Sequence, residues 1–391
     1  MINATLDFKY EDVLALFNTS LQKKIAHSVE LLHKAERLAM AYDSEDGYYL
    51  AFSGGKDSQC LYHVAKLAGV KFKAHMNLTS VDPPEVIRFV KMQYPDVELI
   101  KPKDSIFNIA VKKKILPTKR VRWCCEQYKE TAGAGKVTLI GIRRAESSRR
   151  AKRNEVEINN HSFSGDLIGL EAYRKEMNEK AKRRKSDPRK RQVTIVNANG
   201  ERTLGCIRGK ESLLISPIIH WTEADVWTFL NTLNIAHCEL YDQGYTRIGC
   251  ILCPMSQSNQ KYKEMERWPH VKRNWINAIK AIRIGGGISK QLYLNSGVYP
   301  FKEGYIWWNI RADMVPCRNV GGMLRTSTGH KKTTEEEPPV FSHSSSYDRL
   351  TGEQENEIAE NIFDWWISGK PYKQWYVEKF CQLKLDFKDE E

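Results

Sequence analysis

The feature that most constrains the fold is a regular alternation of short apolar runs with amphipathic segments over residues 20–142. Apolar runs bounded by turn residues are typical of buried strands, and apolar positions spaced three or four apart are typical of helices. The predicted strands cover residues 48–52, 70–76, 97–100 and 137–142. The predicted helices cover residues 20–41, 57–69, 83–94 and 105–114. Strands and helices in this order predict an α/β fold, a parallel sheet with helices on both faces.

Beyond these elements the sequence divides into three parts. We expect one α/β domain over residues 1–255, with a basic insertion at about 151–211, and a mainly helical, aromatic-rich region over 256–391. In the insertion, residues 180–191 (KAKRRKSDPRKR) carry eight basic residues against one aspartate. A run of this kind is a solvated loop or an arm that binds phosphates of DNA or tRNA.

Composition narrows the class of protein. No apolar run approaches the roughly 18 residues of a membrane span, and the first residues lack the pattern of a secretory signal. Nine cysteines, an odd number, fit a reducing compartment better than a disulfide framework. We therefore expect a cytoplasmic protein without a membrane partner. The formal charge of +13 favours anionic ligands but does not choose among them.

The loop between the first predicted strand and its helix, SGGKDS at residues 53–58, is the strongest candidate for a binding site. Consecutive backbone N–H groups at a glycine turn before a helix bind tetrahedral oxyanions, and Lys56 adds a positive charge. The loop differs from a Walker A sequence because Asp57 follows the lysine. The alternative is an ordinary strand-to-helix turn. Asp57 either orients Lys56 or a metal ion, or caps the helix.

A second basic segment follows the strand predicted at residues 137–142. Its sequence, GIRRAESSRR, contains Arg143, Arg144, Arg149 and Arg150. Because the carboxyl ends of parallel strands meet at one edge of a sheet, we expect these arginines to face the same ligand as the loop.

Five stretches in a fixed order resemble the phosphoadenylylsulfate (PAPS) reductase family of the adenine-nucleotide alpha-hydrolase and ATP pyrophosphatase superfamily. They are SGGKDS, LPTKRVRWCCEQYK, GIRRAESSRRA, SPIIHWTEADVW and YDQGYTRIGCILCP, within residues 20–255. The resemblance implies a Rossmann-like fold and an adenine nucleotide as ligand, namely ATP, adenylylsulfate or phosphoadenylylsulfate, with Mg²⁺.

Carried over position by position, the resemblance assigns two groups of residues. The implied catalytic residues are Lys56, Asp57, Arg143 and Arg144. The implied nucleotide-binding residues are Ser53, Gly54, Gly55, Lys56, Asp57, Ser58, Arg149 and Arg150.

Four cysteines have the spacing of metal ligands. Cys124 and Cys125 are adjacent, and Cys250 and Cys253 form a C-x-x-C. An adjacent pair is awkward for one tetrahedral zinc ion and suits a cuboidal cluster better. The resemblance to cluster-bearing members implies a 4Fe–4S cluster on all four. The alternative is that only the C-x-x-C binds zinc or acts as a redox pair, and that the adjacent pair fills the core.

Three hypotheses for the function of the protein remain. Reductases of the family resemble one another in a terminal Glu-Cys-Gly-type motif, which Cys381 in KFCQLKLDFKDEE lacks. The first hypothesis is therefore an iron-sulfur ATP pyrophosphatase, similar to the branch in DNA phosphorothioation systems. It would split ATP to AMP and pyrophosphate to activate an acceptor for sulfur from a cysteine desulfurase or another donor. The second is a sulfonucleotide reductase that releases sulfite, and the third is a non-catalytic nucleotide-binding component of a defence or regulatory assembly.

Overall fold

The computed structural model describes residues 9–159, 161–182, 193–197, 199–284, 352–370, 375 and 378. Contacts group the chain into two compact units, one of Met1–Pro102 with Cys125–Gly249 and one of Lys103–Cys124 with Cys250–Glu391. The division predicted at residue 255 stays a prediction. Most of the basic run, from residue 183 to 191, and Cys381 lie outside the described residues.

The first unit contains a mixed sheet of seven strands in the order β3-β2-β1-β4-β9-β5-β6. The strands from β3 to β9 in this order are parallel. β5 is antiparallel to β9, and β6 is antiparallel to β5. In the order of the sheet, the strands are Glu98–Ile100, Phe72–Asn77, Tyr48–Ala51, Val137–Leu139, Leu213–Ile215, Val156–Ile158 and Ser164–Gly165. The predicted Rossmann-like α/β class is confirmed.

The antiparallel end of the sheet was not expected, because residues 151–211 were interpreted as an insertion outside the sheet. Two of its short segments form β5 and β6, and Val156 pairs with Ile215 of β9. A three-residue strand carries too few alternating positions to be recognised from sequence. Further along, β7 (Thr194–Val196) and β8 (Arg202–Leu204) pair with each other in a separate two-stranded sheet.

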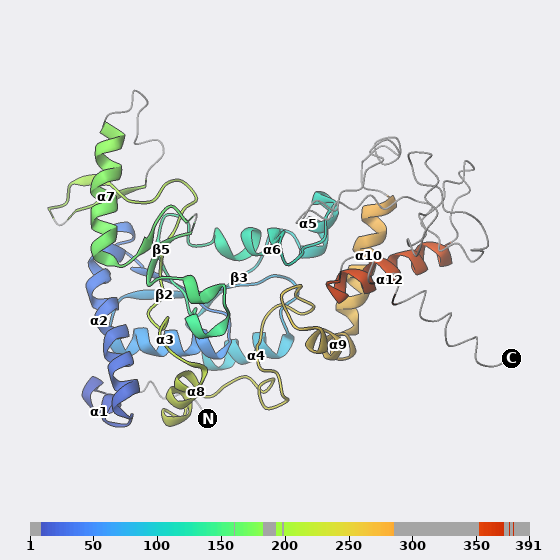
Figure 1. The fold of residues 1–391 in the computed structure, drawn as a ribbon, viewed down its shortest axis with the longest axis horizontal. Helices are drawn as coiled ribbons and strands as arrows, with labels where there is room; N and C mark the ends of the chain where they lie inside the picture. The colour runs from blue at the N-terminus through green and yellow to red at the C-terminus, as the bar shows by residue number, and fades with distance from the viewer. Residues whose placement is uncertain are drawn as a thin grey trace, which may run out of the picture. The chain divides into compact units, whose positions relative to one another are not determined.

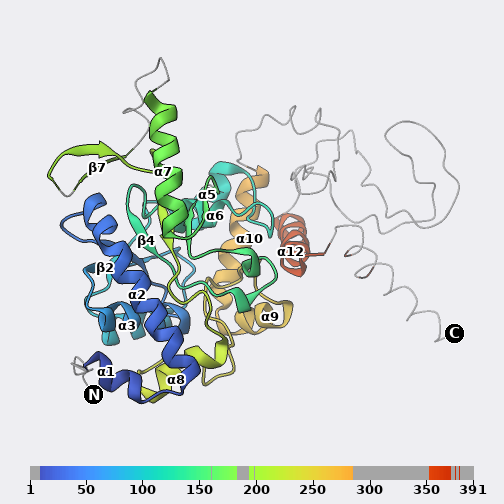
Figure 2. The same ribbon diagram turned by 60° about the vertical axis from the view of Figure 1, so that its left-hand side comes forward.

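Three helices of the first unit follow the apolar stripes predicted at residues 20–41, 57–69 and 83–94. α2 buries Leu21, Ile25 and Leu32 on one face and packs against α3, β1 and β4 (Figure 1). Each such side chain contributes about 1.5–3 kcal/mol when it leaves water. The helices are α1 Tyr10–Ala15, α2 Thr19–Tyr42, α3 Lys56–Ala68, α4 Pro84–Gln93, α7 Leu167–Lys182 and α8 Glu223–Thr232. α7 and β7 stand away from the sheet (Figure 2).

Short helical turns connect the larger elements. They are α6 Trp123–Cys125, η1 Glu126–Glu130, η2 Arg144–Glu146 and η3 Arg150–Lys152. η2 and η3 follow β4 and carry the arginine segment.

Among the described residues of the second unit, the regular structure is helical, as predicted for the C-terminal region. Its helices are α5 Ile106–Lys113, α9 Ser258–Arg267, α10 Pro269–Ile284 and α12 Gly352–Ser368. Trp275 of α10 lies with its ring centroid 4.9 Å from both Phe107 of α5 and Trp366 of α12. Trp366 is buried and its indole N–H donates to the carbonyl of Pro117 at 2.6 Å. This tryptophan therefore belongs to the core of the unit.

Among the described residues, no helix combines the length and the apolar character required to cross a membrane.

Replacing Thr222 with alanine tests the capping of α8. The Thr222 hydroxyl accepts the N–H of Asp225 at 3.1 Å, and the Asp225 carboxylate accepts the N–H of Thr222 at 2.6 Å. We expect Thr222→Ala to lower the free energy of unfolding by about 1 kcal/mol in urea titrations. Thr228→Ala, at an exposed position inside the same helix, should cause no loss. Equal stability of Thr222→Ala and the parent protein would contradict this assignment.

Candidate functional site

The candidate site lies where the carboxyl ends of the neighbouring strands β1 and β4 meet. β1 leads into the loop of residues 53–55 and then α3, and β4 leads into Gly141 and Arg143. A Cβ atom on Gly141 would lie 2.9 Å from the carbonyl oxygen of Asp57, so the two connections are packed closely. Residues about 85 positions apart thereby share one edge of the sheet.

Gly54 gives the loop its shape. Its φ of +71° lies in the left-handed region, which side chains disfavour. A Cβ atom here would also lie 2.7 Å from Val86 and 2.9 Å from Val90, both on α4. Glycine is therefore required at this position for conformation and for space.

Ser58 closes the loop through its hydroxyl. The Ser58 oxygen donates to the carbonyl of Gly55 at 2.8 Å and lies 3.1 Å from the hydroxyl of Ser53. It also accepts the backbone N–H of Ser53 at 3.2 Å. α3 begins at Lys56 with Gly55 as its N-cap, so the N-cap residue itself offers no side chain to the first N–H groups of the helix. These groups lack acceptors within the helix, and such a turn binds anions.

Lys56 is almost fully buried at the start of α3. Its ammonium donates to the carbonyl of Thr246 at 2.9 Å and lies 3.3 Å from the carboxylate of Glu223. Its backbone N–H donates to the hydroxyl of Tyr241 at 2.8 Å. Burial raises the pKa of Tyr241, which keeps this hydroxyl protonated. The cation is thus held within the unit beside the loop.

Tyr241, Thr246 and Glu223 were missed in the sequence analysis. Tyr241 and Thr246 belong to the stretch YDQGYTRIGCILCP, in which only the cysteines were assigned a role. The spacing of Tyr241 from Lys56, 185 positions along the chain, gives no indication of contact. Only the folded chain brings them together.

Asp57 and Arg143 form an ion pair, with Nε 2.5 Å from Oδ1. Burial raises the pKa of Asp57, although the positive charges of Arg143 and Lys56 oppose the rise. Arg143 is 3% exposed, so its guanidinium depends on this carboxylate for compensation. The carboxylate of Asp57 thus positions Arg143. The roles predicted for Asp57, orienting Lys56 or a metal ion or capping the helix, stay predictions.

The other predicted arginines diverge from this pair. Arg144 donates to the carbonyl of Arg153 at 2.8 Å and to the side chain of Asn154 at 3.1 Å. Arg150 pairs with Glu146, and Arg149 is exposed. A direct role for these three in binding a nucleotide stays a prediction, as does a Mg²⁺ ion at Asp57.

The cysteine pairs lie in two kinds of local structure. Cys124 and Cys125 are consecutive residues of α6, and all four cysteines are half-buried. Cys250 and Cys253 bracket a tight turn, in which the N–H of Cys253 meets the carbonyl of Cys250 at 3.3 Å. Leu252 adopts a φ of +57° in this turn, and its N–H donates to Glu264 at 2.6 Å. A C-x-x-C held in such a turn fits two thiolate ligands of one metal centre.

A buried lysine accompanies this turn in the second unit. Lys261 of α9 is 2% exposed and donates to the carbonyl of Ile367 at 2.8 Å. Burial and then Lys119 lower the pKa of Lys261, whereas Cys253 and Glu264 oppose the decrease. A cation next to Cys253 stabilises the thiolate form that metal ligation requires. The four-cysteine ligand set itself stays a prediction.

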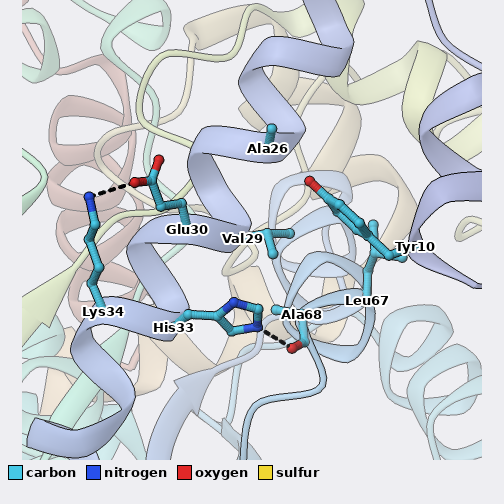
Figure 3. A pocket seen from close by; sticks show the side chains of 8 residues that line it. All are labelled: Tyr10, Ala26, Val29, Glu30, His33, Lys34, Leu67 and Ala68. Atoms are coloured by element: carbon cyan, nitrogen blue, oxygen red, sulfur yellow. Dashed lines mark hydrogen bonds and ion pairs between the residues drawn. The ribbon is translucent and has the colours of Figure 1, made fainter.

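A pocket of about 450 Å³ lies elsewhere in the first unit, between α1, α2 and α3 (Figure 3). Tyr10, Val29 and Leu67 contribute apolar surface, and His33 contacts the carbonyl of Ala68 at 2.6 Å. None of the predicted site residues lines it. The pocket is therefore separate from the loop site.

A family model described as the phosphoadenosine phosphosulfate reductase domain matches residues 47–256. An uncharacterized protein of Methanocaldococcus jannaschii is 25% identical over 281 residues, 70% of this chain and 56% of that protein. The adenosine 5'-phosphosulfate reductase of Oceanobacillus iheyensis is 40% identical over 58 residues, 15% of this chain and 24% of the reductase. Among solved structures, the U34-tRNA thiolase NcsA of Methanococcus maripaludis with its 4Fe–4S cluster covers 68% of this chain and 79% of its own. Its identity is 12% and its TM-score 0.32. The chain spans about half the length of the first curated relatives it matches.

Replacing Gly54 with alanine tests the conformation of the loop. The left-handed backbone costs a non-glycine residue about 1–2 kcal/mol, and the contacts with Val86 and Val90 add to this cost. We expect Gly54→Ala to lower the free energy of unfolding by at least about 2 kcal/mol in urea titrations.

Gly249→Ala is the matched control. A Cβ atom there meets no heavy atom within 4 Å, and the residue does not need a positive φ. Its stability should change by less than about 0.5 kcal/mol. If Gly54→Ala behaved like this control, the loop conformation described above would be wrong.

Proposed function

Because the chain belongs to the phosphoadenosine phosphosulfate reductase domain family, we propose that it is an ATP pyrophosphatase. In this proposal it splits ATP to AMP and pyrophosphate and so activates an acceptor for sulfur incorporation. One observation carries the proposal: the loop of residues 53–58 places helix N–H groups, Lys56 and the Asp57–Arg143 pair at one edge of the sheet. These are donors and cations of the kind that stabilise a polyphosphate.

Each side chain has a definite part in this proposal. The N–H groups at the start of α3 bind the pyrophosphate portion of ATP, and Lys56 neutralises the charge that develops on it. Glu223 is the partner that Lys56 exchanges for phosphate, and the Glu223 side chain is 59% exposed, so water readily replaces the lost contact. Arg143, positioned by Asp57, lies beside the α-phosphate. Mg²⁺, when bound, supplies further charge neutralisation to the phosphates.

We further propose that Cys124, Cys125, Cys250 and Cys253 hold a 4Fe–4S cluster. Two local features support the cluster: the C-x-x-C turn, and the buried Lys261 whose charge interacts with Cys253. The zinc alternative uses the C-x-x-C alone. In this proposal the cluster is required for folding and positioning and is not an electron donor.

A nucleic acid is the acceptor that we propose, either DNA or tRNA, in a phosphorothioation-like modification in the cytoplasm. The formal charge of +13 and the eight basic residues of the segment 180–191 support a polyanionic acceptor. A cysteine desulfurase or another sulfur donor supplies the sulfur in this reaction.

Sulfonucleotide reduction is the second candidate. It is favoured by the 40% identity to an adenosine 5'-phosphosulfate reductase over 58 residues. The two reactions differ in their product, because one releases pyrophosphate from ATP and the other releases sulfite from adenylylsulfate.

An anaerobic assay with ATP and adenylylsulfate in parallel tests the function, with and without DNA or tRNA. We expect pyrophosphate release from ATP, and a loss of at least about 100-fold in kcat/KM for Lys56→Met, because that variant removes a charge from the phosphates. Lys66→Met, at an exposed position of the same helix, should leave the rate unchanged. Sulfite release from adenylylsulfate would support the reductase instead, and tight binding without turnover would support a nucleotide-binding component.

The colour of anaerobically purified protein tests the cluster. We expect a brown protein with a broad visible absorption, about four iron atoms per chain, and loss of the colour in Cys250→Ser. Cys238→Ser, a substitution of a buried cysteine outside the set, should keep its iron. If the parent protein were colourless and contained stoichiometric zinc, the cluster would be ruled out in favour of the zinc alternative.

A further inference from the structure

Two histidines and a glutamate converge at the edge of the sheet next to the arginine segment. His27 lies on α2, Glu155 directly precedes β5, and His220 follows β9. The Nε2 atoms of His27 and His220 lie 2.7 Å and 2.8 Å from the same Oε1 of Glu155. One possible ligand atom of each residue lies within 4.8 Å of the others. These three residues have no part in the proposed reaction.

We propose that His27, Glu155 and His220 bind one divalent transition-metal ion, for which Zn²⁺ has the best fit. Two imidazoles and one carboxylate form the type of donor set found in open zinc sites. Zinc bonds of about 2.0–2.2 Å in a tetrahedral arrangement separate the ligand atoms by about 3.4 Å. The observed separations of 2.7 Å and 2.8 Å require only a small outward movement of each side chain to admit the ion.

Hydrogen bonds outside the donor set hold the three segments in place before any ion binds. Ser28, adjacent to His27, is fully buried; its hydroxyl donates to the carbonyl of Pro217 at 2.7 Å and accepts the indole N–H of Trp221 at 3.1 Å. These contacts fix α2 against both sides of His220. The carbonyl of Glu155 accepts the N–H of Ser216 at 2.8 Å. The donor set is therefore supported by buried hydrogen bonds outside it, as a metal site requires.

Exposure leaves a coordination position open. The side chains of His27 and His220 are 46% and 39% exposed, and that of Glu155 is 17% exposed. Three protein ligands on this open side allow water or a donor from another molecule to complete the tetrahedron. Hydrogen bonds alone would also hold each histidine on Glu155. However, exposed pairs of that kind contribute little to the stability of the folded protein. They also give no reason for two imidazoles to share one carboxylate oxygen.

The site would also affect the arginine segment. Arg144 donates its backbone N–H to Ile219, next to His220, and its side chain contacts Arg153 and Asn154, next to Glu155. An ion that joins His220 to Glu155 would thus hold the two segments that position Arg144. We expect Zn²⁺ to raise the unfolding temperature of the protein for this reason.

Cobalt substitution of the full-length protein distinguishes this site from the cysteines. Cobalt bound by thiolates shows charge-transfer absorption in the near ultraviolet, and cobalt bound by imidazole and carboxylate does not. We expect the parent protein to bind one equivalent of Co²⁺ that lacks this band and is displaced by Zn²⁺. The variant His27→Gln/His220→Gln should lose this equivalent, with affinity reduced at least about tenfold. His33→Gln, on the same helix, should retain it.

A second experiment uses the parent protein alone, so its result does not depend on whether the double variant folds. Carbethoxylation mapped by mass spectrometry reports the reactivity of each histidine with and without Zn²⁺. We expect Zn²⁺ to protect His27 and His220 and to leave His33 and His237 unchanged. Equal reactivity of His27 and His220 with and without Zn²⁺, or an unchanged number of thiolate-free Co²⁺ equivalents in the double variant, would overturn the proposal.

Discussion

The parallel pairing of β1 with β4 is the constraint on which the candidate site depends. It sets the carboxyl ends of two strands side by side, although their residues are almost ninety positions apart. The ion pair of Asp57 and Arg143 connects these two ends, with Nε of Arg143 2.5 Å from Oδ1 of Asp57. Because Arg143 is buried, a loss of this pairing would leave a charge without compensation inside the protein. The loop and the arginine segment therefore form as one structure.

In the proposed function, the buried charge at this edge also lowers the free-energy cost of binding an anion. Lys56 and Arg143 are both withdrawn from water, yet each is held near a carboxylate, Glu223 and Asp57 respectively. An incoming phosphate does not have to desolvate these cations, because folding has already done so. It has to replace an exposed carboxylate at Lys56, which costs less than stripping water from a free ammonium. Without a ligand, each of the two buried cations is therefore balanced by a carboxylate.

Three groups of side chains for which we propose a function lie along the same edge of the sheet. The loop of residues 53–58 follows β1, the arginines follow β4, and the cluster of His27, Glu155 and His220 lies at β9 and β5. Arg144 connects the second group to the third through its contacts with the segments beside Glu155 and His220. The unexpected antiparallel strand β5 explains the position of Glu155: β5 begins beside the carboxyl end of β9, where Val156 pairs with Ile215, so Glu155 just before it lies at this edge.

The sequence by itself determined the α/β class, and it supplies the glycines and the cationic residues on which the proposed anion-binding loop depends. Local reasons were sufficient for these features, since apolar periodicity, glycine turns and capping residues act over a few neighbouring positions. The loop of Gly54 and the capping of α8 by Thr222 are examples in which a short stretch specifies its own backbone.

Only the tertiary structure decided which charges meet. Tyr241, Thr246 and Glu223 reach Lys56 from distant parts of the chain, and Arg144 turns away from the loop although Arg143 points to it. Strands β5 and β6 belong to the sheet because each forms hydrogen bonds with a neighbouring strand. The short sequences of β5 and β6 do not indicate which strand that neighbour is. Contacts between residues far apart in the chain depend on strand order and register, and no local pattern encodes these.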